Sequence, residues 1–517
     1  MNTMGYTVTS ISADQDRITI RGRCEGAQGA ALPELSVYEF APYEPDPQYT
    51  DKAPVEHVVF EPDADGFALT LDRISRGRDR IYSRYRVGAR NMDDSGVDLL
   101  GGVCYVTEIQ TSAYDYPFPT SDTIKGLQVN MVDDAIKLGV GHAALNLNLP
   151  TIMRPAKTDQ TLTHTVDGRE YYFDQAYMNR FDQRVMELSD NGIVVTLILL
   201  NSARWDGVEV APELSKALMH PDYDPEGRIS AFNVLTEDGL AHYRAFCGFV
   251  GERYTRPDAR YGRACGFIIG NEVDAQWIWC NAGTKTVEQY VREYATAVRT
   301  MFTAARTRYA RARVYISLTH HWAISHCDDP KRCYQGREVI EELNRICQVE
   351  GDFDWSVAYH PYPQDLAHSD FWNDDTAIDS FDTPRITFKN IHILLDYMAQ
   401  PHLCFNGRLR HIILSEQGFH SDETEAGEQL QAAAYAYAFW KIAQLPGIES
   451  FILHAHVDNR DEFDLNLGLW RRDKSSSLPS QPGSPKPIYD VFRDIDGPKR
   501  DEWIAWAKAI VGEDNWK

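Results

Sequence analysis

The sequence lacks an apolar run long enough to cross a lipid bilayer, which takes about 20 residues. Its longest apolar run, Ile193–Leu200, has the length of a strand. The first residues, MNTMGYTVTSISADQDR, show no basic segment followed by an apolar one, so no secretion signal is visible. These absences lead us to expect a cytoplasmic protein that does not act at a membrane.

Positive charge is also scarce. The chain has 76 Asp and Glu against 52 Lys and Arg, a formal net charge of -24. A field of that sign repels phosphate backbones and anionic lipids. We therefore expect neither nucleic acid nor a membrane surface as a partner, and polyanionic substrates are disfavoured.

Cysteine is infrequent, and the glycine-rich phosphate motifs are missing. Nine cysteines, an odd number over 517 residues, do not indicate a disulfide framework. Cys327 and Cys333 are close in sequence, but we expect them to be buried thiols in a reducing compartment. No G-x-G-x-x-G or Walker pattern follows an early strand, so no nucleotide is expected, and we expect no cofactor or metal.

What the sequence does contain begins with an all-β pattern in residues 1–115. Short segments rich in Val, Ile, Tyr and Thr alternate with clusters of Gly, Asp and Pro; examples are YTVTSI, DRITIRGRC, LSVYEF, FALTL and GVCYVTEI. This pattern predicts a small N-terminal β-sandwich. Nothing in it looks catalytic, and we expect it to brace the rest of the chain.

Residues 116–517 show a different pattern, in which an apolar strand is followed by an amphipathic helix again and again. The expected strands are 125–129, 141–149, 193–200, 266–272, 312–322, 353–363, 410–419 and 449–459. Eight such alternations, with strands apolar on both faces, predict a (β/α)8 TIM barrel as the catalytic domain.

Two glutamates stand directly after apolar strands of this barrel. Glu272 ends the fourth strand and Glu416 the seventh, and strand ends carry the active sites of such barrels. Hydrolysis of a glycosidic bond needs two carboxyl groups that flank the anomeric carbon. Either glutamate alone fits a salt bridge at the rim equally well. Together they predict a glycoside hydrolase acting on a carbohydrate.

These motifs resemble clan A of the glycoside hydrolases, whose members carry Asn-Glu after strand four and a nucleophilic Glu after strand seven. The matching residues here are Asn271-Glu272 and Glu416, and His360-Pro361-Tyr362 matches the His-x-Tyr that many members have after strand six. The resemblance implies that Glu272 is the general acid/base and Glu416 the nucleophile of a retaining enzyme. It also implies that Asn271 and His360 contact the sugar and that Tyr362 contacts Glu416.

The same resemblance implies a bond with an equatorial leaving group, as in β-D-glycosides or α-L-arabinosides. The chain departs from the clan pattern at two strand ends. Asn146 and Asn148, which we expect to contact substrate, stand where many members have an arginine after strand two, and His454, His456 and Asp458 stand where many have a tryptophan after strand eight. These departures leave the exact family and the sugar open.

Further residues after the strands are candidates for contact with substrate. Trp277 and Trp279 follow Glu272 and offer flat rings for stacking on a sugar, although loop packing would give the same pattern. His321 and Trp322 end the fifth strand, and His456 follows the eighth. We also expect the long segment from Asn201 to Asp238 to wall the cleft, because long ordered loops tend to be functional.

Two other functions remain open at this stage. His454-x-His456 with Asp458 has the spacing of metal ligands on a strand, which would suit a metal-dependent barrel hydrolase. In metal-dependent barrels of the amidohydrolase type, however, such a histidine pair ends the first strand. The other possibility is a barrel that binds carbohydrate without cleaving it, although such a protein would have no need for both carboxylates.

Overall fold

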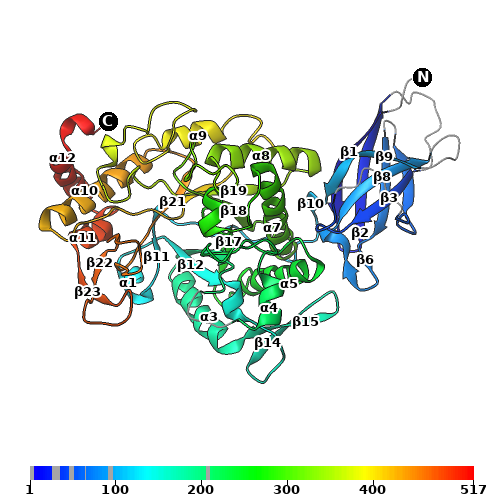
Figure 1. Ribbon diagram of the computed structural model, residues 1–517, viewed down its shortest axis with the longest axis horizontal. Helices are drawn as coiled ribbons and strands as arrows, with labels where there is room; N and C mark the ends of the chain where they lie inside the picture. The colour runs from blue at the N-terminus through cyan, green and yellow to red at the C-terminus, as the bar shows by residue number, and fades with distance from the viewer. Residues whose placement is uncertain are drawn as a thin grey trace.

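The computed structural model describes residues 5–25, 35–45, 52–63, 66–90, 97–204 and 210–516. Figure 1 shows the N-terminal strands as a separate group beside the larger helical and barrel part, next to α7 and α8. The two parts are joined by packing: the guanidinium of Arg244 lies over the Tyr82 ring at 4.2 Å, and the hydroxyl of Ser112 donates to the carbonyl of Arg306 at 2.6 Å.

The N-terminal part consists of small sheets that are mainly antiparallel. Its main strands are β1 (Gly5–Ala13), β2 (Arg17–Glu25), β3 (Leu35–Phe40), β4 (Val59–Asp63), β5 (Gly66–Asp72), β8 (Arg84–Arg90), β9 (Val97–Tyr105) and β10 (Glu108–Ile109). The order is β10-β1-β2-β5-β4 in one sheet and β3-β8-β9 in another. Alternate residues such as Ile18 and Ile20 of β2 are buried in one apolar cluster that also takes Val37 and Val87 of the second sheet.

The predicted barrel is confirmed: eight parallel strands close on themselves. They are β11 (Lys125–Gln128), β12 (His142–Asn148), β16 (Val194–Leu200), β17 (Ala264–Ile269), β18 (Arg313–Leu318), β19 (Trp355–Tyr359), β20 (Ile412–Leu414) and β21 (Ile448–Leu453). Each overlaps the segment expected from the sequence, although β17 begins two residues and β21 one residue earlier than expected. Every residue of β16, β17 and β19 is buried, as expected for strands covered on both faces.

The inside of the barrel is apolar in the middle and polar at one end. One cluster of buried side chains fills its middle, made of Ala144, Ile198, Leu200, Ile229, Ile268, Tyr315, Ala358, Ile413 and Ile452. Two residues further along the chain, on the same face by the period of two of a strand, five of these positions become polar. They are Asn146, Ser317, His360, Ser415 and His454. The inward face therefore turns polar at the carboxyl ends of the strands.

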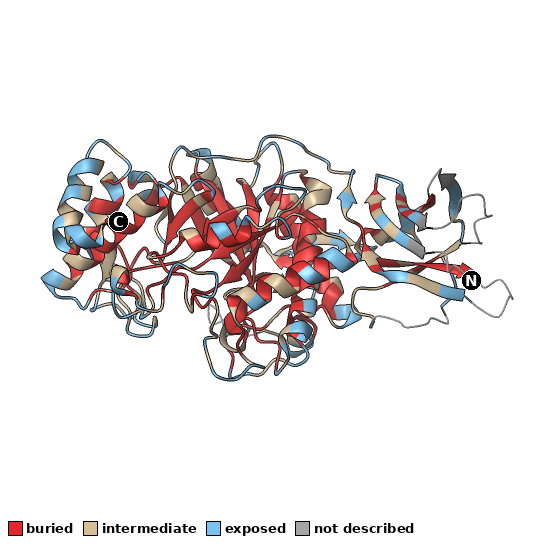
Figure 2. Cartoon of the chain, turned by 90° about the horizontal axis from the view of Figure 1, so that it is seen from above, coloured by how far each residue is buried: buried red, intermediate tan, exposed pale blue. Residues whose placement is uncertain are grey.

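Helices pack around this barrel, and Figure 2 shows that their buried residues face it. The main ones are α1 (Val132–Lys137), α3 (Gln175–Asp190), α5 (Glu237–Tyr254), α7 (Val287–Arg308), α8 (Gly336–Glu350), α9 (His392–Met398), α10 (Glu425–Ile442), α11 (Pro487–Asp494) and α12 (Arg500–Val511). Short helices α2 (Leu149–Ile152), α4 (Pro212–Leu218) and α6 (Gln276–Trp279) occupy loops. Within the described ranges, no helix is long and apolar enough to cross a membrane.

Some elements were not expected from the sequence. Between β12 and α3 the chain forms a three-stranded sheet of β13 (Met153–Arg154), β14 (Thr161–Val166) and β15 (Arg169–Asp174). Near the C-terminus, β22 (Trp470–Arg472) pairs with β23 (Pro482–Pro485). The expectation that Cys327 and Cys333 are free thiols is wrong, because the two form a disulfide that closes a short loop after β18.

A buried cation fixes the start of β20, the strand that leads to Glu416. Arg410 has a fully buried side chain and pairs with both carboxylate oxygens of Asp352, at 2.9 and 2.7 Å. It also donates to the carbonyls of Leu403 and Phe353, each at 2.8 Å. These bonds tie the segment before β20 to the segment before β19.

We expect Arg410→Met to lower the free energy of unfolding by about 3–5 kcal/mol, because it leaves the Asp352 carboxylate without its partner in a partly buried place. Arg408→Met, at an exposed position two residues earlier, should change it by less than about 0.5 kcal/mol. Urea unfolding followed by circular dichroism measures both. Equal midpoints for the two variants would show that the buried pair does not stabilise the barrel.

Candidate active site

Glu272 and Glu416 meet at the carboxyl end of the barrel. Glu272 follows β17 in a left-handed backbone conformation (φ 41°), and its N–H donates to Ser317 Oγ at 3.0 Å. Glu416 follows β20, and both glutamates are partly buried. A carboxylate oxygen of each, together with a ring nitrogen of His360, lies within 4.8 Å of the others. The structure thus brings together two carboxylates expected from the sequence.

His360 lies between the strand ends and contacts the first glutamate. Its side chain is 2% exposed, and Nδ1 is 2.9 Å from Glu272 Oε1. Nε2 is 3.1 Å from Ser415 Oγ and 3.4 Å from Ser317 Oγ. Burial alone would lower the pKa of His360, but the charges of Glu416 and Glu272 outweigh it and raise the pKa above its ordinary value. The ring is therefore suited to share a proton with Glu272.

The carboxylate of Glu416 accepts one hydrogen bond on each oxygen. Tyr362 donates its hydroxyl to Oε1 at 3.2 Å, and Gln128 donates its amide to Oε2 at 3.0 Å. Burial, and next the charge of Glu416, raise the pKa of Tyr362 well above 10, so its hydroxyl remains a donor. Two donors of this kind orient the carboxylate.

Several residues around the pair were not identified from the sequence. Gln128 ends β11 and could have been found by applying the strand-end rule to the first strand as well. Ser317 and Ser415 are inward positions of their strands, but a serine gives no signal of its own. Glu462, from the loop after β21, lies 3.3 Å from His454 and could not have been assigned a partner from sequence.

Asp274, also missed, holds the turn that follows Glu272. It is fully buried, and its carboxylate accepts from the N–H of Thr319 at 2.9 Å and from its hydroxyl at 2.5 Å. Burial raises the pKa of Asp274 to about 7, against the lowering effect of these hydrogen bonds. The contact fixes the loop after β17 to the end of β18.

Three residues expected to contact substrate are instead bonded within the protein. Asn148 is 2% exposed, and its amide is bonded to Ser202 and Thr151. Trp322 is fully buried and donates its indole N–H to Phe381. His456 is fully buried between the N–H groups of Asn130 and Met131 and the carboxylate of Asp134. Their surroundings do not fit the expected contact with a sugar.

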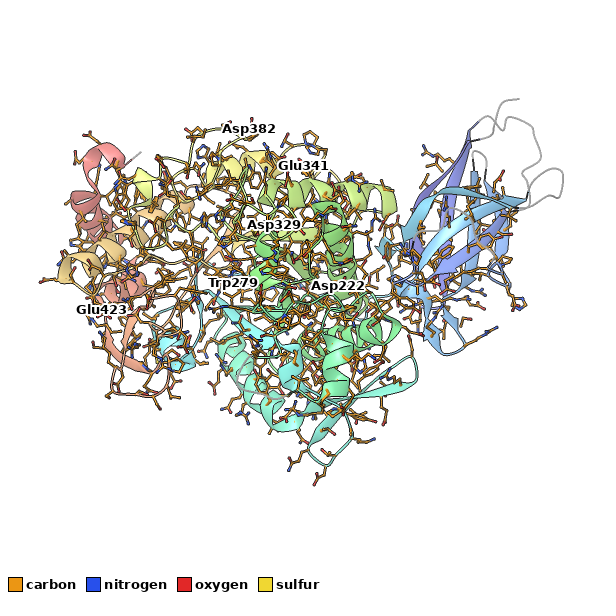
Figure 3. The ribbon with its side chains drawn as sticks, in the orientation of Figure 1. Asp222, Trp279, Asp329, Glu341, Asp382 and Glu423 are labelled. Carbon is orange, nitrogen blue, oxygen red and sulfur yellow. A yellow bond between two sulfur atoms is a disulfide. The ribbon has the colours of Figure 1, made fainter. Side chains whose placement is uncertain are left out.

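The remaining candidates keep some access or lie nearby. Asn271 and Asn146 are partly buried, and Asn146 lies on the inward side of β12. Trp279, labelled in Figure 3, packs against the cluster inside the barrel and meets Phe463 edge-on at 6.0 Å. Arg228, from the long segment after β16, lies over the Phe463 ring at 4.2 Å, while residues 205–209 of that segment lie outside the described residues.

Trp277 and His321 are engaged with protein groups. The guanidinium of Arg332 covers the Trp277 ring at 3.8 Å. His321 is 8% exposed, 3.1 Å from Thr319 Oγ1, and burial lowers its pKa to about 3. Neither shows a contact with the glutamate pair among the described residues.

The residues of the metal-site alternative do not converge. The Asp458 carboxylate pairs with Lys486 at 2.8 Å in a buried ion pair, and His456 pairs with Asp134 at 2.9 Å. His454 instead faces Gln128 at 2.8 Å. Within the described part of the chain, the group whose donors have metal-ligand spacing is Glu272, His360 and Glu416.

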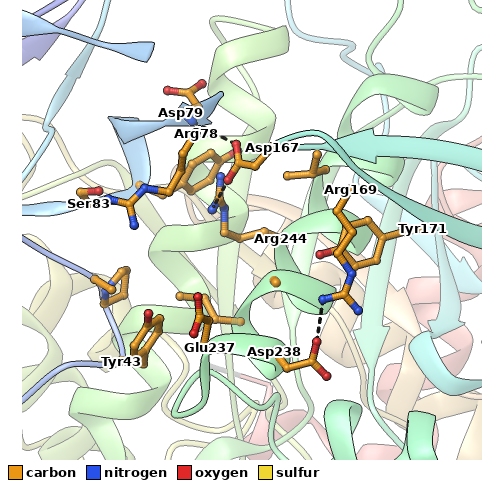
Figure 4. Close-up of a pocket in the computed structure, with 16 residues that line it drawn as sticks. Tyr43, Arg78, Asp79, Ser83, Asp167, Arg169, Tyr171, Glu237, Asp238 and Arg244 are labelled. Carbon is orange, nitrogen blue, oxygen red and sulfur yellow. Dashed lines mark hydrogen bonds and ion pairs between the residues drawn. The ribbon is translucent and has the colours of Figure 1, made fainter. Parts of the chain in front are cut away.

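A hollow of about 520 Å³ lies elsewhere, where the N-terminal part meets the barrel part (Figure 4). It is lined by Tyr43 and Arg78 from the first part and by Arg169 and Arg244 from the second. The arginines are paired, Arg169 with Asp238 at 2.6 Å and Arg244 with Asp167 at 2.8 Å. None of the site residues expected from the sequence lines it.

The fold is similar to those of solved glycoside hydrolases. A family 39 glycoside hydrolase from Bacteroides cellulosilyticus is 13% identical over 96% of this chain and 80% of its own, with a TM-score of 0.48. A β-glucosidase from Pyrococcus furiosus is 15% identical over 73% and 86%, with a TM-score of 0.45. An exo-β-1,4-mannosidase from Opitutaceae bacterium strain TAV5 is 17% identical over 76% and 59%, with a TM-score of 0.42.

At these identities and scores the likeness carries no argument about activity, which has to be argued from the site itself. No curated protein matches the sequence. A family model does match residues 117–517, the whole of the barrel part, and its description is a family of unknown function, DUF5722. Because the match covers well over half of the chain, the protein belongs to the family DUF5722.

Proposed function

We propose that this protein is a retaining glycoside hydrolase, with Glu272 as general acid/base and Glu416 as nucleophile. The observation that carries the proposal is the approach of the two carboxylates to within 4.8 Å at the mouth of a (β/α)8 barrel. Retaining enzymes hold their carboxyl groups about 5–5.5 Å apart, whereas inverting enzymes need about 6.5–9.5 Å to admit a water molecule. The separation supports double displacement.

In the first step, a Glu416 oxygen attacks the anomeric carbon while Glu272 donates its proton to the departing glycosidic oxygen. The bond from carbon to the leaving group breaks, and an ester between the sugar and Glu416 forms. In the second step, Glu272 takes a proton from water, the water oxygen attacks the same carbon, and the ester bond breaks. Two inversions leave the anomeric configuration unchanged.

The surrounding donors suit these two roles. Tyr362 and Gln128 each donate to Glu416, which supports the charged form that the attack requires. His360 contacts Glu272 at 2.9 Å and can hold that carboxyl group toward the leaving group while sharing its proton. The resemblance to clan A supports a substrate with an equatorial bond, in β-D-glycosides or α-L-arabinosides. We further propose that the N-terminal sheets form a sandwich that braces the barrel.

A second function is favoured by one observation, since Glu272, His360 and Glu416 also have the spacing of metal ligands. A hydrolase that bound an ion there would use bound water as its nucleophile. We expect instead that aryl glycoside cleavage persists after dialysis against EDTA, because the proposed steps need only protons and carboxylates. Elemental analysis of the purified protein, with activity lost on chelation and restored by one divalent ion, would favour the metal-dependent function.

Replacing each of the two glutamates by alanine should change the activity in a different way. Glu416→Ala removes the atom that forms the ester, so every glycoside should become nearly inert. Glu272→Ala removes proton assistance, which is worth about 10²–10⁴-fold in rate. With dinitrophenyl glycosides this loss should largely disappear for the first step, because dinitrophenolate leaves without taking up a proton. Azide, which needs no base, should then restore turnover and give a glycosyl azide of unchanged anomeric configuration. Product analysis by NMR measures this.

Glu341→Ala, on the outer helix α8, serves as the matched control and should retain wild-type rates. The assignment of roles would be wrong if Glu416→Ala, rather than Glu272→Ala, gave the azide of retained configuration. A protein inactive toward a full panel of dinitrophenyl glycosides would support a barrel that binds carbohydrate without cleaving it.

Removal of the Tyr362 hydroxyl should act on catalysis rather than on binding. Tyr362→Phe leaves the ring in place but removes the donor to Glu416 Oε1, whose charge changes as the ester forms. We expect kcat to fall by about ten- to a hundredfold with little change in KM. Steady-state kinetics on an aryl glycoside, beside Tyr334→Phe as a buried tyrosine bonded to the carbonyl of Lys285, test this. Wild-type kcat in Tyr362→Phe would reduce Tyr362 to a packing residue.

A further inference from the structure

A continuous chain of polar contacts runs from the loop after β21 to Glu416. Glu462 Oε1 lies 3.3 Å from His454 Nε2, and His454 Nδ1 lies 2.8 Å from Gln128 Oε1. Gln128 Nε2 in turn donates to Glu416 Oε2 at 3.0 Å and to the carbonyl of Ser415 at 3.3 Å. Three strand ends, β11, β20 and β21, and one loop contribute to this chain.

The partners at each end determine where the protons lie. The Gln128 amide faces two acceptors on one side, the Glu416 carboxylate and the Ser415 carbonyl, so its NH2 group has to point there. Its oxygen then faces His454 Nδ1, which must carry a proton to bond it. The Glu462 carboxylate lies 3.3 Å from Nε2, an ion-pair distance without hydrogen-bond geometry, and its charge favours a proton on this nitrogen as well. With both ring nitrogens protonated, His454 is a cation.

We propose that Glu462, His454 and Gln128 form a positioning relay in which the cationic His454 locks the Gln128 amide and thereby holds Glu416 oriented and ionised. This inference rests on the proposed role of Glu416 as nucleophile. A neutral imidazole that kept its one proton on Nε2, toward Glu462, would leave Nδ1 as an acceptor, so that the Gln128 amide would rotate and turn its oxygen toward the Glu416 carboxylate. The relay also brings a positive charge toward a carboxylate that must stay charged in order to attack.

The charges that face His454 agree with a cation. Glu462 comes from the loop after β21, Glu416 from the end of β20 and Glu272 from the end of β17. Burial would lower the pKa of His454, but these three carboxylates, Glu462 above all, raise it to about 9. Glu462 shows the reciprocal effect: burial raises its pKa, and His454 next to it lowers the pKa overall. The relay should therefore remain intact at neutral pH and lose its charge as the pH passes about 9.

A dinitrophenyl glycoside isolates this titration, because its leaving group needs no proton from Glu272. We expect kcat/KM of the wild type for such a substrate to stay level through neutral pH and to fall as the pH passes about 9. In Glu462→Gln the fall should move to lower pH by at least about one unit, since the partner that holds the second proton is gone. In His454→Gln the fall should vanish, with kcat/KM lower by about ten- to a hundredfold at every pH.

His411→Gln is the matched control, a histidine that also pairs with a glutamate, Glu449, but stands just before β20, whereas His454 directly follows β21. It should leave the pH profile unchanged.

Side-chain NMR of the full chain, with the His454 signals assigned from their absence in His454→Gln, gives the ionisation of His454 without any turnover. A neutral His454 at pH 7 would overturn the relay even if glycosides are cleaved. If His454 is a cation but no glycoside is cleaved, the proposed function fails instead, and the role of the relay in holding a nucleophile fails with it. An unchanged pH profile in Glu462→Gln would also overturn the relay.

Discussion

The repulsion between Glu272 and Glu416 is the constraint on which the rest of the site depends. Two ionised carboxylates within 4.8 Å of each other repel by about 3–4 kcal/mol at an effective dielectric constant near 20. The protein meets this cost by surrounding the two groups unequally. Tyr362 and Gln128 donate to Glu416, while Glu272 faces the ring of His360, with which it can share a proton. The two carboxylates therefore have different partners, a hydroxyl and an amide for Glu416 and an imidazole for Glu272.

The barrel supplies this asymmetry through its geometry. Inward side chains are apolar at Ala358, Ile413 and Ile452 and polar two residues later, at His360, Ser415 and His454. Strand ends from different parts of the chain thus deliver their polar groups to one small volume. The ion pair of Arg410 with Asp352 fixes the start of β20. The position of Glu416, at the other end of this strand, is thereby fixed relative to His360. The packing below the site and the hydrogen bonds within it therefore together determine where the polar side chains of the site lie.

The sequence predicted the features that depend on local pattern. All eight barrel strands follow from apolar runs, and the meeting of Glu272 with Glu416 follows from the two of these runs that end in a glutamate. Its failures concern partners brought from far along the chain. Trp322, His456 and Asn148 also follow strands, but Phe381, Asp134 and Ser202 bind them inside the protein. Glu462 could not be linked to His454 for the same reason, because only the fold brings that loop back over the barrel. The disulfide of Cys327 with Cys333 was missed because the expectation of free thiols rested on the number of cysteines in the whole chain, which gives no information about this loop.

The nature of the residue at position 454 follows from what it has to bridge. Its neighbours are an amide oxygen on one side and a carboxylate on the other, and an imidazolium presents two donors in fixed, divergent directions. A lysine would bring a single flexible, strongly hydrated charge. An arginine would bring five N–H donors to a place with two acceptors, the Gln128 oxygen and the Glu462 carboxylate. A tryptophan, which many clan members have here, offers one N–H and no charge. A histidine at this position acts on the Glu416 carboxylate through Gln128, without contacting it, and this effect ends when the histidine loses one proton.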